Sequence, residues 1–479
     1  MQRFIKRHWL VLLILLVILY LVVGLYAPFA VGKKISSQTV ADFDVNSLYS
    51  DTLSTDRAML VETNQSALDE RIRLLNQAKE RIILSTFDMR EGESTRDVLS
   101  VILNKAEEGI QVQILVDGVS GAIRMEGNPL FYAIAAHPNV EIRIYNPLNL
   151  LMPWKSQGRM HDKYVIVDDL AYILGGRNTF DYFLGMYDVT DSSYDREVLI
   201  YNTAAGKPKS SQSSLFEVED YFHQVWNLEV CKPFHNDTSL LEQENVREET
   251  KNLHTRYQEI RKSMSPLFEE PQYLKKTVEV NGVHLLSNPI GIYGKEPVLF
   301  YQLSQLMQNA KERVIIHTPY TVCNGFMYDT LAGIVKEVPD TTMLINSVEN
   351  GDNVMASSDY LYNKKKVVDT GIKLYEYDGG NSYHGKSIVI DHNISLIGSY
   401  NLDLRSTYVD TELMLMVQSE ELTSQLTACM DAFQEDSRKV VDAKNYEVPE
   451  HVTVASMPVW RKAMYRVIGF VMQAFRYLV

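Results

Sequence analysis

Between residues 60 and 445, short apolar runs alternate with longer amphipathic stretches. Apolar runs of about four to eight residues predict buried strands, and an apolar repeat of about 3.6 residues predicts helices. On this basis we expect strands at 140–145 and 197–201 and helices near 66–77 and 298–308. Strands that alternate with helices predict an α/β fold in which helices cover the faces of a sheet.

The N-terminal segment has a different pattern, because residues 9–32 contain no charged side chain. As a helix, this segment would be about 36 Å long, enough to cross a hydrocarbon core of about 30 Å. We expect a transmembrane signal anchor, and a cleaved secretory signal with a weak cleavage site near 27–30 is the alternative. Three basic residues precede the span and two follow it, which favours a single pass with the N-terminus inside.

The last segment, residues 458–479, predicts a basic amphipathic helix. Its polar positions recur at steps of three and four, so they form one narrow stripe on a surface that is otherwise mostly apolar. Such a helix lies in the headgroup plane of a membrane or packs on the core of its own protein, and both alternatives stay open. The polar positions are Lys462, Arg466, Gly469, Gln473 and Arg476.

The middle of the chain contains an internal repeat. Residues 78–86 (AKERIILST) return as residues 310–318 (AKERVIIHT), each after a predicted helix. Because further strand and helix patterns follow in the same order, we predict two tandem α/β lobes, at 60–228 and 280–445. The charged stretch 229–279 between them is expected to be a solvated connector.

Charge and cysteine content bear on the class of partner. Acidic residues outnumber basic ones, 61 to 47, for a formal charge of −14. Proteins that wrap nucleic acid normally carry a basic surface, so we expect no nucleic-acid partner. The three cysteines are widely spaced and odd in number, and they form neither a CxxC metal site nor a disulfide framework.

Each predicted lobe contains one copy of the same polar motif. A histidine is followed by a lysine two positions later, an aspartate five further on and an asparagine ten after that, with identical spacing in both copies. Two such matches, one in each half of a repeat, indicate a functional site. The motif consists of His161, Lys163, Asp168 and Asn178 in the first lobe and of His384, Lys386, Asp391 and Asn401 in the second.

The residue types in this motif suit phosphoryl transfer. Side chains alternate along a strand, so the histidine and the lysine of each copy point to one face. Lysine and asparagine stabilise charge on phosphate oxygens, a neutral imidazole can attack phosphorus, and a protonated imidazole can protonate the leaving alkoxide. Asp168 and Asp391 fall beside predicted turns, where they belong to the site or serve as structural turn residues.

The paired motif resembles the HxK–D signature of the phospholipase D superfamily, over about residues 60–445. The resemblance implies two α/β lobes packed face to face around one active site, and a covalent phosphohistidine intermediate formed without a metal ion or other cofactor. It implies His161 as the nucleophile and His384 as the general acid. An acid is also implied behind each histidine; Glu197 and Glu412 are the candidates, and exposed carboxylates at strand starts are the alternative interpretation.

Residues 398–406 (GSYNLDLRS) are similar to the second motif of bacterial cardiolipin synthases, one branch of this superfamily. This similarity implies a phosphatidyltransferase in the bacterial cell membrane that moves a phosphatidyl group between phospholipids. The expected partners are the bilayer and phosphatidylglycerol, with phosphatidylethanolamine as a further candidate. A hydrolytic phospholipase D that releases phosphatidic acid is the close alternative, and a nuclease of the same superfamily is a more distant one.

Overall fold

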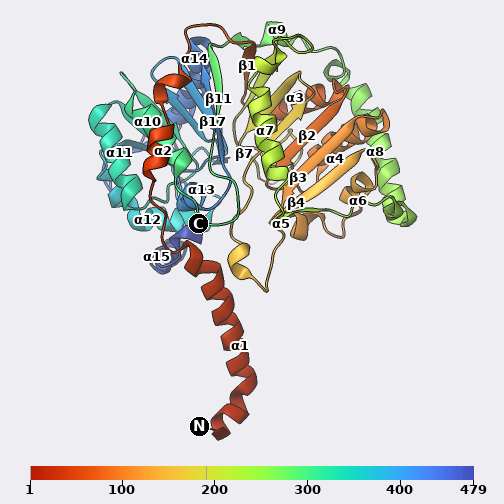
Figure 1. Ribbon diagram of the computed structural model, residues 1–479. Helices are drawn as coiled ribbons and strands as arrows, with labels where there is room; N and C mark the ends of the chain where they lie inside the picture. Colours follow the sequence, from red (N-terminus) through yellow and green to blue (C-terminus); the bar gives the residue numbers. More distant parts are fainter. Residues whose placement is uncertain (1, 190, 479) are drawn as a thin grey trace.

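The chain forms two α/β lobes side by side, from the base of which a long N-terminal helix, α1 (Gln2–Tyr26), projects (Figure 1). The computed structural model describes residues 2–189 and 191–478. In this part of the chain each lobe is built on a sheet of nine strands. The predicted α/β class, the tandem lobes and the apolar N-terminal helix are therefore confirmed.

The sheet of the first lobe is mixed, because β2, β3 and β4 run parallel and the remaining pairs are antiparallel. Helices α3 (Asn64–Asn76), α4 (Glu93–Glu107) and α6 (Pro129–Ala135) bury their apolar sides against it. In spatial order the strands are β10 (Val278–Glu279), β1 (Asp56–Val61), β8 (Glu197–Asn202), β6 (Ala171–Gly175), β5 (Tyr164–Val167), β2 (Arg81–Thr86), β3 (Gln111–Asp117), β4 (Val140–Tyr145) and β9 (Cys231–Pro233).

The second sheet repeats this topology and differs only in its outermost strands. Helices α10 (Val298–Gln308), α11 (Gly325–Glu337) and α12 (Val354–Val368) pack on it. Its strands, in spatial order, are β11 (Gly282–Ser287), β18 (Leu413–Gln418), β17 (Ile394–Gly398), β16 (Ser387–Ile390), β12 (Val314–His317), β13 (Thr341–Asn346), β14 (Lys373–Tyr377), β19 (Ser437–Val440) and β20 (Tyr446–Glu447).

The two sheets face each other and share one apolar core. Ile166 and Tyr172 of the first sheet belong to the same buried cluster as Val389 and Ile397 of the second. Helices α7 (Leu215–Trp226) and α14 (Glu420–Glu435) contribute to this cluster as well. Since burial of apolar area is the main driving force for folding, this shared core holds the two lobes in a fixed relation.

The connector between the lobes is more ordered than its charge predicts. Much of it forms α8 (Glu244–Ser263), which packs against α4 and α6 of the first lobe. The apolar residues of α8 recur every three or four positions and therefore lie on one side of the helix, as in an amphipathic helix. The buried side chains are Val246, Leu253, Tyr257 and Ile260, which join the core of that lobe.

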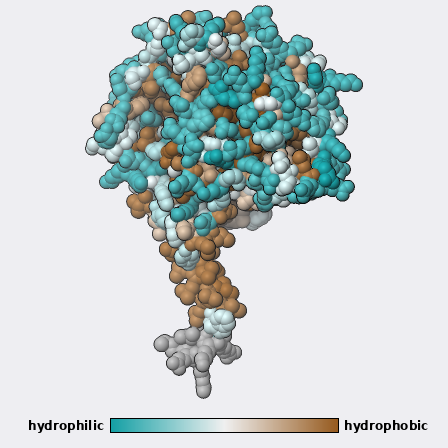
Figure 2. Space-filling view, turned by 45° about the vertical axis from the view of Figure 1, so that its right-hand side comes forward, coloured by the Kyte–Doolittle hydropathy of each residue, from teal (hydrophilic) through white to brown (hydrophobic). Residues whose placement is uncertain are grey.

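The end of α1 that joins the lobes lies beside the C-terminal segment at the base of the molecule, whereas the N-terminus lies at the far tip of α1 (Figure 1). Residues His8–Phe29, in α1 and the following turn, are long enough and apolar enough to cross a membrane; all but the buried Phe29 at the end are at least partly exposed, and they form the brown stalk in Figure 2. The predicted C-terminal helix is present as α15 (Val459–Met472), followed by a short turn at Arg476–Leu478. Residue 479, the last of the predicted segment, lies outside the described residues.

Asp168 and Asp391 lie in the turns after β5 and β16, at the opposite ends of these strands from the histidines. Asp168 accepts hydrogen bonds from the backbone N–H groups of three successive residues, 79–81, and Asp391 does the same for 311–313. Both residues have positive φ, 49° and 53°. Of the two alternatives, membership of the site and a structural role in a turn, this placement supports the second, and we assign both residues a structural role.

Replacement of Asp168 tests this assignment. Asp168→Ala removes the acceptor for three backbone N–H groups and places alanine in the left-handed region, so we expect a loss of about 2 kcal/mol of stability. Turnover per folded molecule should not change. Asp169→Ala is the control, because Asp169 is exposed and its ion pair with Arg81 should contribute less than about 1 kcal/mol. Thermal unfolding and activity would be measured together; an Asp168 variant with normal stability and no turnover would contradict the structural role.

Candidate active site

The two histidine–lysine pairs occupy equivalent places in the two lobes. His161 and Lys163 immediately precede β5, and His384 and Lys386 immediately precede β16. Before each histidine, the backbone pairs with the other lobe. Met160 bridges to Thr411, and the short strand β15 (Ser382–Tyr383) pairs with β7 (Ser193–Tyr194). Both motifs therefore lie at the seam between the lobes.

Each histidine is hydrogen-bonded to an acid of the opposite lobe. The Nδ1 atom of His161 lies 2.9 Å from Oε1 of Glu412, and that of His384 lies 2.6 Å from Oδ2 of Asp195. Because such a bond at Nδ1 fixes the ring and leaves Nε2 for chemistry, each imidazole is oriented by a group that its own lobe does not supply.

Glu412 is thus placed as predicted, but Glu197 is not. The carboxylate of Glu197 makes a bidentate ion pair with Arg71, at 2.6 and 2.5 Å, and lies 3.7 Å from Arg177. Its expected place behind a histidine is taken by Asp195, two residues earlier. This corrects the expectation that the two glutamates have equivalent roles.

The motif residues between glycine and asparagine explain this difference. The first lobe has Gly176 and Arg177 where the second has Ser399 and Tyr400. The Ser399 hydroxyl donates to Glu412 at 2.5 Å and helps to hold it behind His161. In the first lobe a Cβ atom on residue 176 would collide with the Asp195 carboxylate, so glycine leaves room for this side chain. Arg177 donates a hydrogen bond to the backbone carbonyl of Asp195 and so fixes the backbone there.

The two acids differ in charge as well as position. Burial alone would raise the pKa of Asp195, but Lys386 and the bonded His384 lower it to about 2. Burial raises the pKa of Glu412 to about 8, although Lys163 and two serine hydroxyls oppose the change. Asp195 is therefore the stronger stabiliser of a positive charge on its histidine.

The pKa values of the two histidines differ in the same way as those of the acids behind them. Burial, and then the positive charge of Lys163, lower the pKa of His161 well below its usual value. Burial and Lys386 also lower the pKa of His384, but Asp195 raises it in return. Of the two rings, His161 is the one more strongly held in the neutral form.

The lysines and asparagines of the motif surround the same space. Lys163 and Lys386 each donate a hydrogen bond to the carbonyl of their own histidine, and Lys386 Nζ lies 3.0 Å from Nε2 of His384. Burial lowers the pKa of Lys163 to about 7. Asn178 accepts a hydrogen bond from the backbone N–H of residue 88, and the Asn401 amide donates to Tyr320 at 3.4 Å. The buried side-chain oxygen of Asn401 has no hydrogen-bond partner among the described residues.

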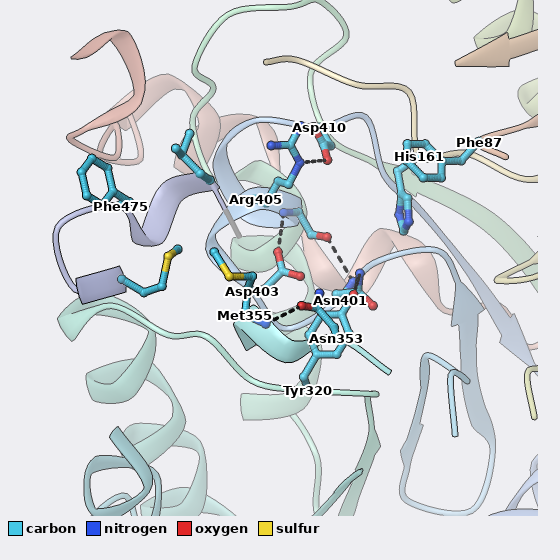
Figure 3. Close-up of a pocket in the computed structure, with 13 residues that line it drawn as sticks. Phe87, His161, Tyr320, Asn353, Met355, Asn401, Asp403, Arg405, Asp410 and Phe475 are labelled. Carbon is cyan, nitrogen blue, oxygen red and sulfur yellow. Dashed lines mark hydrogen bonds and ion pairs between the residues drawn. The ribbon is translucent and has the colours of Figure 1, made fainter. Parts of the chain in front are cut away.

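Two pockets meet at this site. The pocket beside His161 has a volume of about 480 Å³, and the pocket beside His384 one of about 810 Å³. Both are lined by Phe87, Tyr320 and Asn353, which lie between them. In Figure 3 the His161 ring lies next to Phe87, opposite Asn401 and Tyr320. The two pockets therefore form one reaction space, which is reached from two sides.

Several side chains at the site lie outside the four-residue motif of each lobe. Phe87 and Phe183 lie against the rings of His161 and His384, with centroids 5.2 and 5.1 Å apart. Arg405 lines the His161 pocket and pairs with Asp410 at 2.8 Å. Among the described residues, no group of three or more histidine, cysteine, aspartate or glutamate side chains is arranged to hold a metal ion.

Comparison with known proteins agrees with this geometry. The sequence model of the family described as "Cardiolipin synthase, PLD-like domain" matches twice, at residues 72–202 and 303–433. The chain belongs to this family. It is an enzyme of the phospholipase D superfamily, of the cardiolipin synthase-like phosphatidyltransferase type, and the two matches coincide with the two lobes.

Individual relatives of this family member are distant. Cardiolipin synthase C of Escherichia coli is 25% identical over 409 residues, which cover 76% of this chain and 81% of that protein. An uncharacterised protein of Helicobacter pylori is 26% identical over 408 residues, or 77% and 78% of the two chains. The crystal structure of a phosphatidylserine synthase from Haemophilus influenzae covers 92% of this chain and 100% of that one, with a TM-score of 0.63 and 14% identity, and so shows the same fold.

The roles of Asp195 and Glu197 are separable by pH. If protonated His384 acts as an acid, activity falls as pH rises through its pKa. Asp195→Asn removes the charge that raises this pKa, so we expect the alkaline limb of kcat/KM to move to lower pH. The measurement is a pH–rate profile with phosphatidylglycerol in mixed micelles.

Glu197→Gln is the matched control for this experiment. It leaves Arg71 and Arg177 buried with less charge compensation, which should cost about 3–5 kcal/mol of stability without moving the alkaline limb. A shift of that limb in the Glu197 variant, and none in the Asp195 variant, would reverse the assignment.

Proposed function

We propose that the protein is a membrane-anchored phosphatidyltransferase that forms cardiolipin-type lipids by moving a phosphatidyl group onto the hydroxyl group of a second phospholipid. The observation that carries this proposal is the pair of histidines at the seam between the lobes. Each is hydrogen-bonded to an acid of the opposite lobe and has a pocket beside it. The family and the cardiolipin synthase relatives support a phospholipid substrate.

In the first step, Nε2 of His161 attacks the phosphorus of the donor lipid. The bond between phosphorus and the headgroup oxygen breaks, and His384 gives its proton to the leaving alkoxide. Lys163, Lys386 and the two motif asparagines stabilise the negative charge on the other phosphate oxygens. The neutral state of His161 and the ionised Asp195 behind His384 favour this order of roles over the reverse.

In the second step, a hydroxyl group of the acceptor lipid attacks the phosphohistidine. His384, now neutral, takes the hydroxyl proton, and the bond between phosphorus and Nε2 of His161 breaks. Water in place of the acceptor would give phosphatidic acid, the product of a hydrolytic phospholipase D. Transfer therefore requires that the acceptor lipid, rather than water, reaches the intermediate.

The two pockets suit the two parts of a phospholipid. Met355, Met472, Phe475 and Leu478 give the His161 pocket an apolar wall, which fits the glycerol and acyl region of the donor. The His384 pocket is the more polar of the two and takes the headgroup that leaves and the hydroxyl that arrives. The phosphate lies between them, next to both histidines.

The charge of the polar pocket favours phosphatidylethanolamine as one of the donors. Its carboxylates outnumber its basic side chains, and an ammonium group released beside them would gain electrostatic stabilisation. Phosphatidylglycerol, whose headgroup has free hydroxyls, remains the proposed acceptor. The acidic side chains of this pocket are Asp88, Glu91, Asp181, Asp191 and Asp352, and its basic side chain is Arg90.

We also propose that α1 anchors the protein as a single-pass span in a bacterial membrane, with its N-terminus inside. Its apolar side chains, most of them exposed, support this anchoring. A bilayer anchor keeps the active site at the surface where donor and acceptor lipids are both concentrated. The basic residues before the span support the orientation.

Product analysis separates the candidate reactions. Purified full-length protein would receive labelled phosphatidylglycerol with and without phosphatidylethanolamine, and products would be identified by mass. We expect cardiolipin in both cases and a faster reaction when phosphatidylethanolamine is present. Phosphatidic acid without cardiolipin would indicate hydrolysis. If neither lipid were formed, the proposal would be contradicted.

A substrate with a good leaving group separates the roles of the histidines. With a p-nitrophenyl phosphatidyl ester, departure of the phenolate needs little protonation, but the second step still needs a base. We therefore expect His384→Ala to release a burst of about one equivalent of p-nitrophenolate and to accumulate phosphohistidine, detected by mass. His161→Ala should give no burst; a burst in this variant and none in the other would exchange the two roles.

A further inference from the structure

The C-terminal helix α15 packs on the protein with its polar stripe turned inward. Three of the five stripe positions, Gly469 in the helix and Gln473 and Arg476 just beyond it, lie against α12, next to the buried Tyr465, whereas most apolar side chains of the helix stay exposed. Of the two alternatives that the sequence left open, the structure shows a helix docked on its own protein.

The contact with α12 is tight and specific. Arg476 binds the carboxylate of Asp359 at 2.7 and 2.9 Å, and Gln473 donates to the same group at 3.1 Å. A side chain on Gly469 would collide with the backbone carbonyl of Ser358, so glycine allows the two helices to approach closely. Asp359 is buried, and such a hydrogen-bonded ion pair holds α15 in one rotation about its axis.

This rotation turns large apolar side chains of α15 outward. Val467 is 63% exposed and Phe470 68% exposed, and neither packs on the hydrophobic core clusters of the described residues. Exposed apolar side chains that are contiguous, rather than scattered, mark surfaces that contact a partner or a membrane. The others on this side of α15 are Val459, Trp460, Met464 and Val471.

A second exposed apolar segment lies on the other side of α1, in the loop at residues 148–152. Leu150 is 74% exposed and Leu151 83% exposed. The loop is attached to the N-terminal helix, because the hydroxyl of Tyr20 donates to the Leu151 carbonyl at 2.6 Å. In Figure 1 it forms the yellow turn at the base of the molecule, beside α1.

Both segments adjoin the exposed apolar helix α1. Tyr26, at its end, contacts the ring of Phe475 just beyond α15, with centroids 5.1 Å apart. Residues 148–152 and the outward side of α15 thus lie on two sides of the point where α1 leaves the lobes (Figure 1), and we call these two exposed apolar segments the collar. The collar adjoins the proposed membrane anchor through the contacts of Tyr20 and Tyr26.

We propose that the collar inserts into the surface of the bilayer and seats the active site against it. Lys462 and Arg466, on the flanks of α15, would then lie among anionic headgroups. Met472, Phe475 and Leu478, in the same C-terminal segment, line the pocket of His161. The segment that contacts the membrane is therefore also a wall of the donor pocket, and an acyl chain passes from the bilayer into the pocket along it. This inference rests on the proposed anchoring of α1 and on the proposed lipid substrate.

Fluorescence of Trp460 tests the contact without an activity assay. Full-length protein would be reconstituted into vesicles of phosphatidylglycerol and phosphatidylcholine with brominated acyl chains. The difference between wild type and Trp460→Phe isolates this tryptophan from Trp9, Trp154 and Trp226. We expect bromines near the headgroup end of the chain to remove at least half of this difference signal. A Trp460 signal quenched by aqueous iodide and not by bromolipid would overturn the proposal.

Variants of the collar test its effect on catalysis. Val467→Glu with Phe470→Glu places two charges on exposed positions, so the fold should be retained, as thermal unfolding would show. We expect at least a tenfold loss of turnover with long-chain lipid in vesicles and no loss with a water-soluble short-chain lipid. The control is Leu274→Glu in α9 (Tyr273–Lys276), which is 62% exposed at the opposite end of the molecule (Figure 1).

The outcomes distinguish this inference from the proposed function. Equal loss with both substrates, or equal loss in the Leu274 control, would contradict a membrane role of the collar. Bromolipid quenching of Trp460 in a protein that makes no cardiolipin would support the collar and overturn the proposed reaction alone.

Discussion

The structure depends on the hydrogen bonds that cross the seam between the lobes, from each histidine to an acid of the other lobe. A histidine ring that attacks phosphorus, or protonates a leaving group, has to keep one orientation, and a bond at Nδ1 provides it. The shared apolar core behind the seam holds donor and acceptor of these bonds at a fixed distance. Neither lobe contains a complete catalytic group, so the site exists only when both lobes are folded and packed.

Within this symmetric frame, small differences in side chain separate the two roles. Glycine at position 176 admits Asp195 behind His384, and serine at position 399 holds Glu412 behind His161. The acids then differ in charge: Lys386 and His384 lower the pKa of Asp195, whereas burial outweighs Lys163 and raises the pKa of Glu412. A duplicated unit thereby acquires one ring suited to attack and one suited to carry a proton. The same sheet topology in both lobes shows that the asymmetry arose without change to the fold.

The surroundings of the site connect it to the membrane. The pocket of His161 takes part of its wall from the C-terminal segment, which is tied to α12 by a buried ion pair and contacts the end of α1. The end of α1 and the C-terminal segment thus meet beside the donor pocket. An enzyme that acts on lipids gains from this arrangement, because the anchor, the apolar surface and the pocket share one side of the molecule.

The sequence by itself determined the α/β lobes, their duplication, the apolar first helix and the histidine–lysine pairs, because each follows from local periodicity or from spacing along one segment. Only the tertiary structure decided which acid serves which histidine. Glu197 and Glu412 have equivalent positions in the sequence repeat. In the structure, however, Glu197 forms an ion pair with Arg71 of α3, and Asp195 is the acid that binds His384. The direction of the polar stripe on α15 likewise depended on a buried Asp359 in another helix. Periodicity identifies the two sides of a helix, but the partner that packs against it decides which side faces the protein.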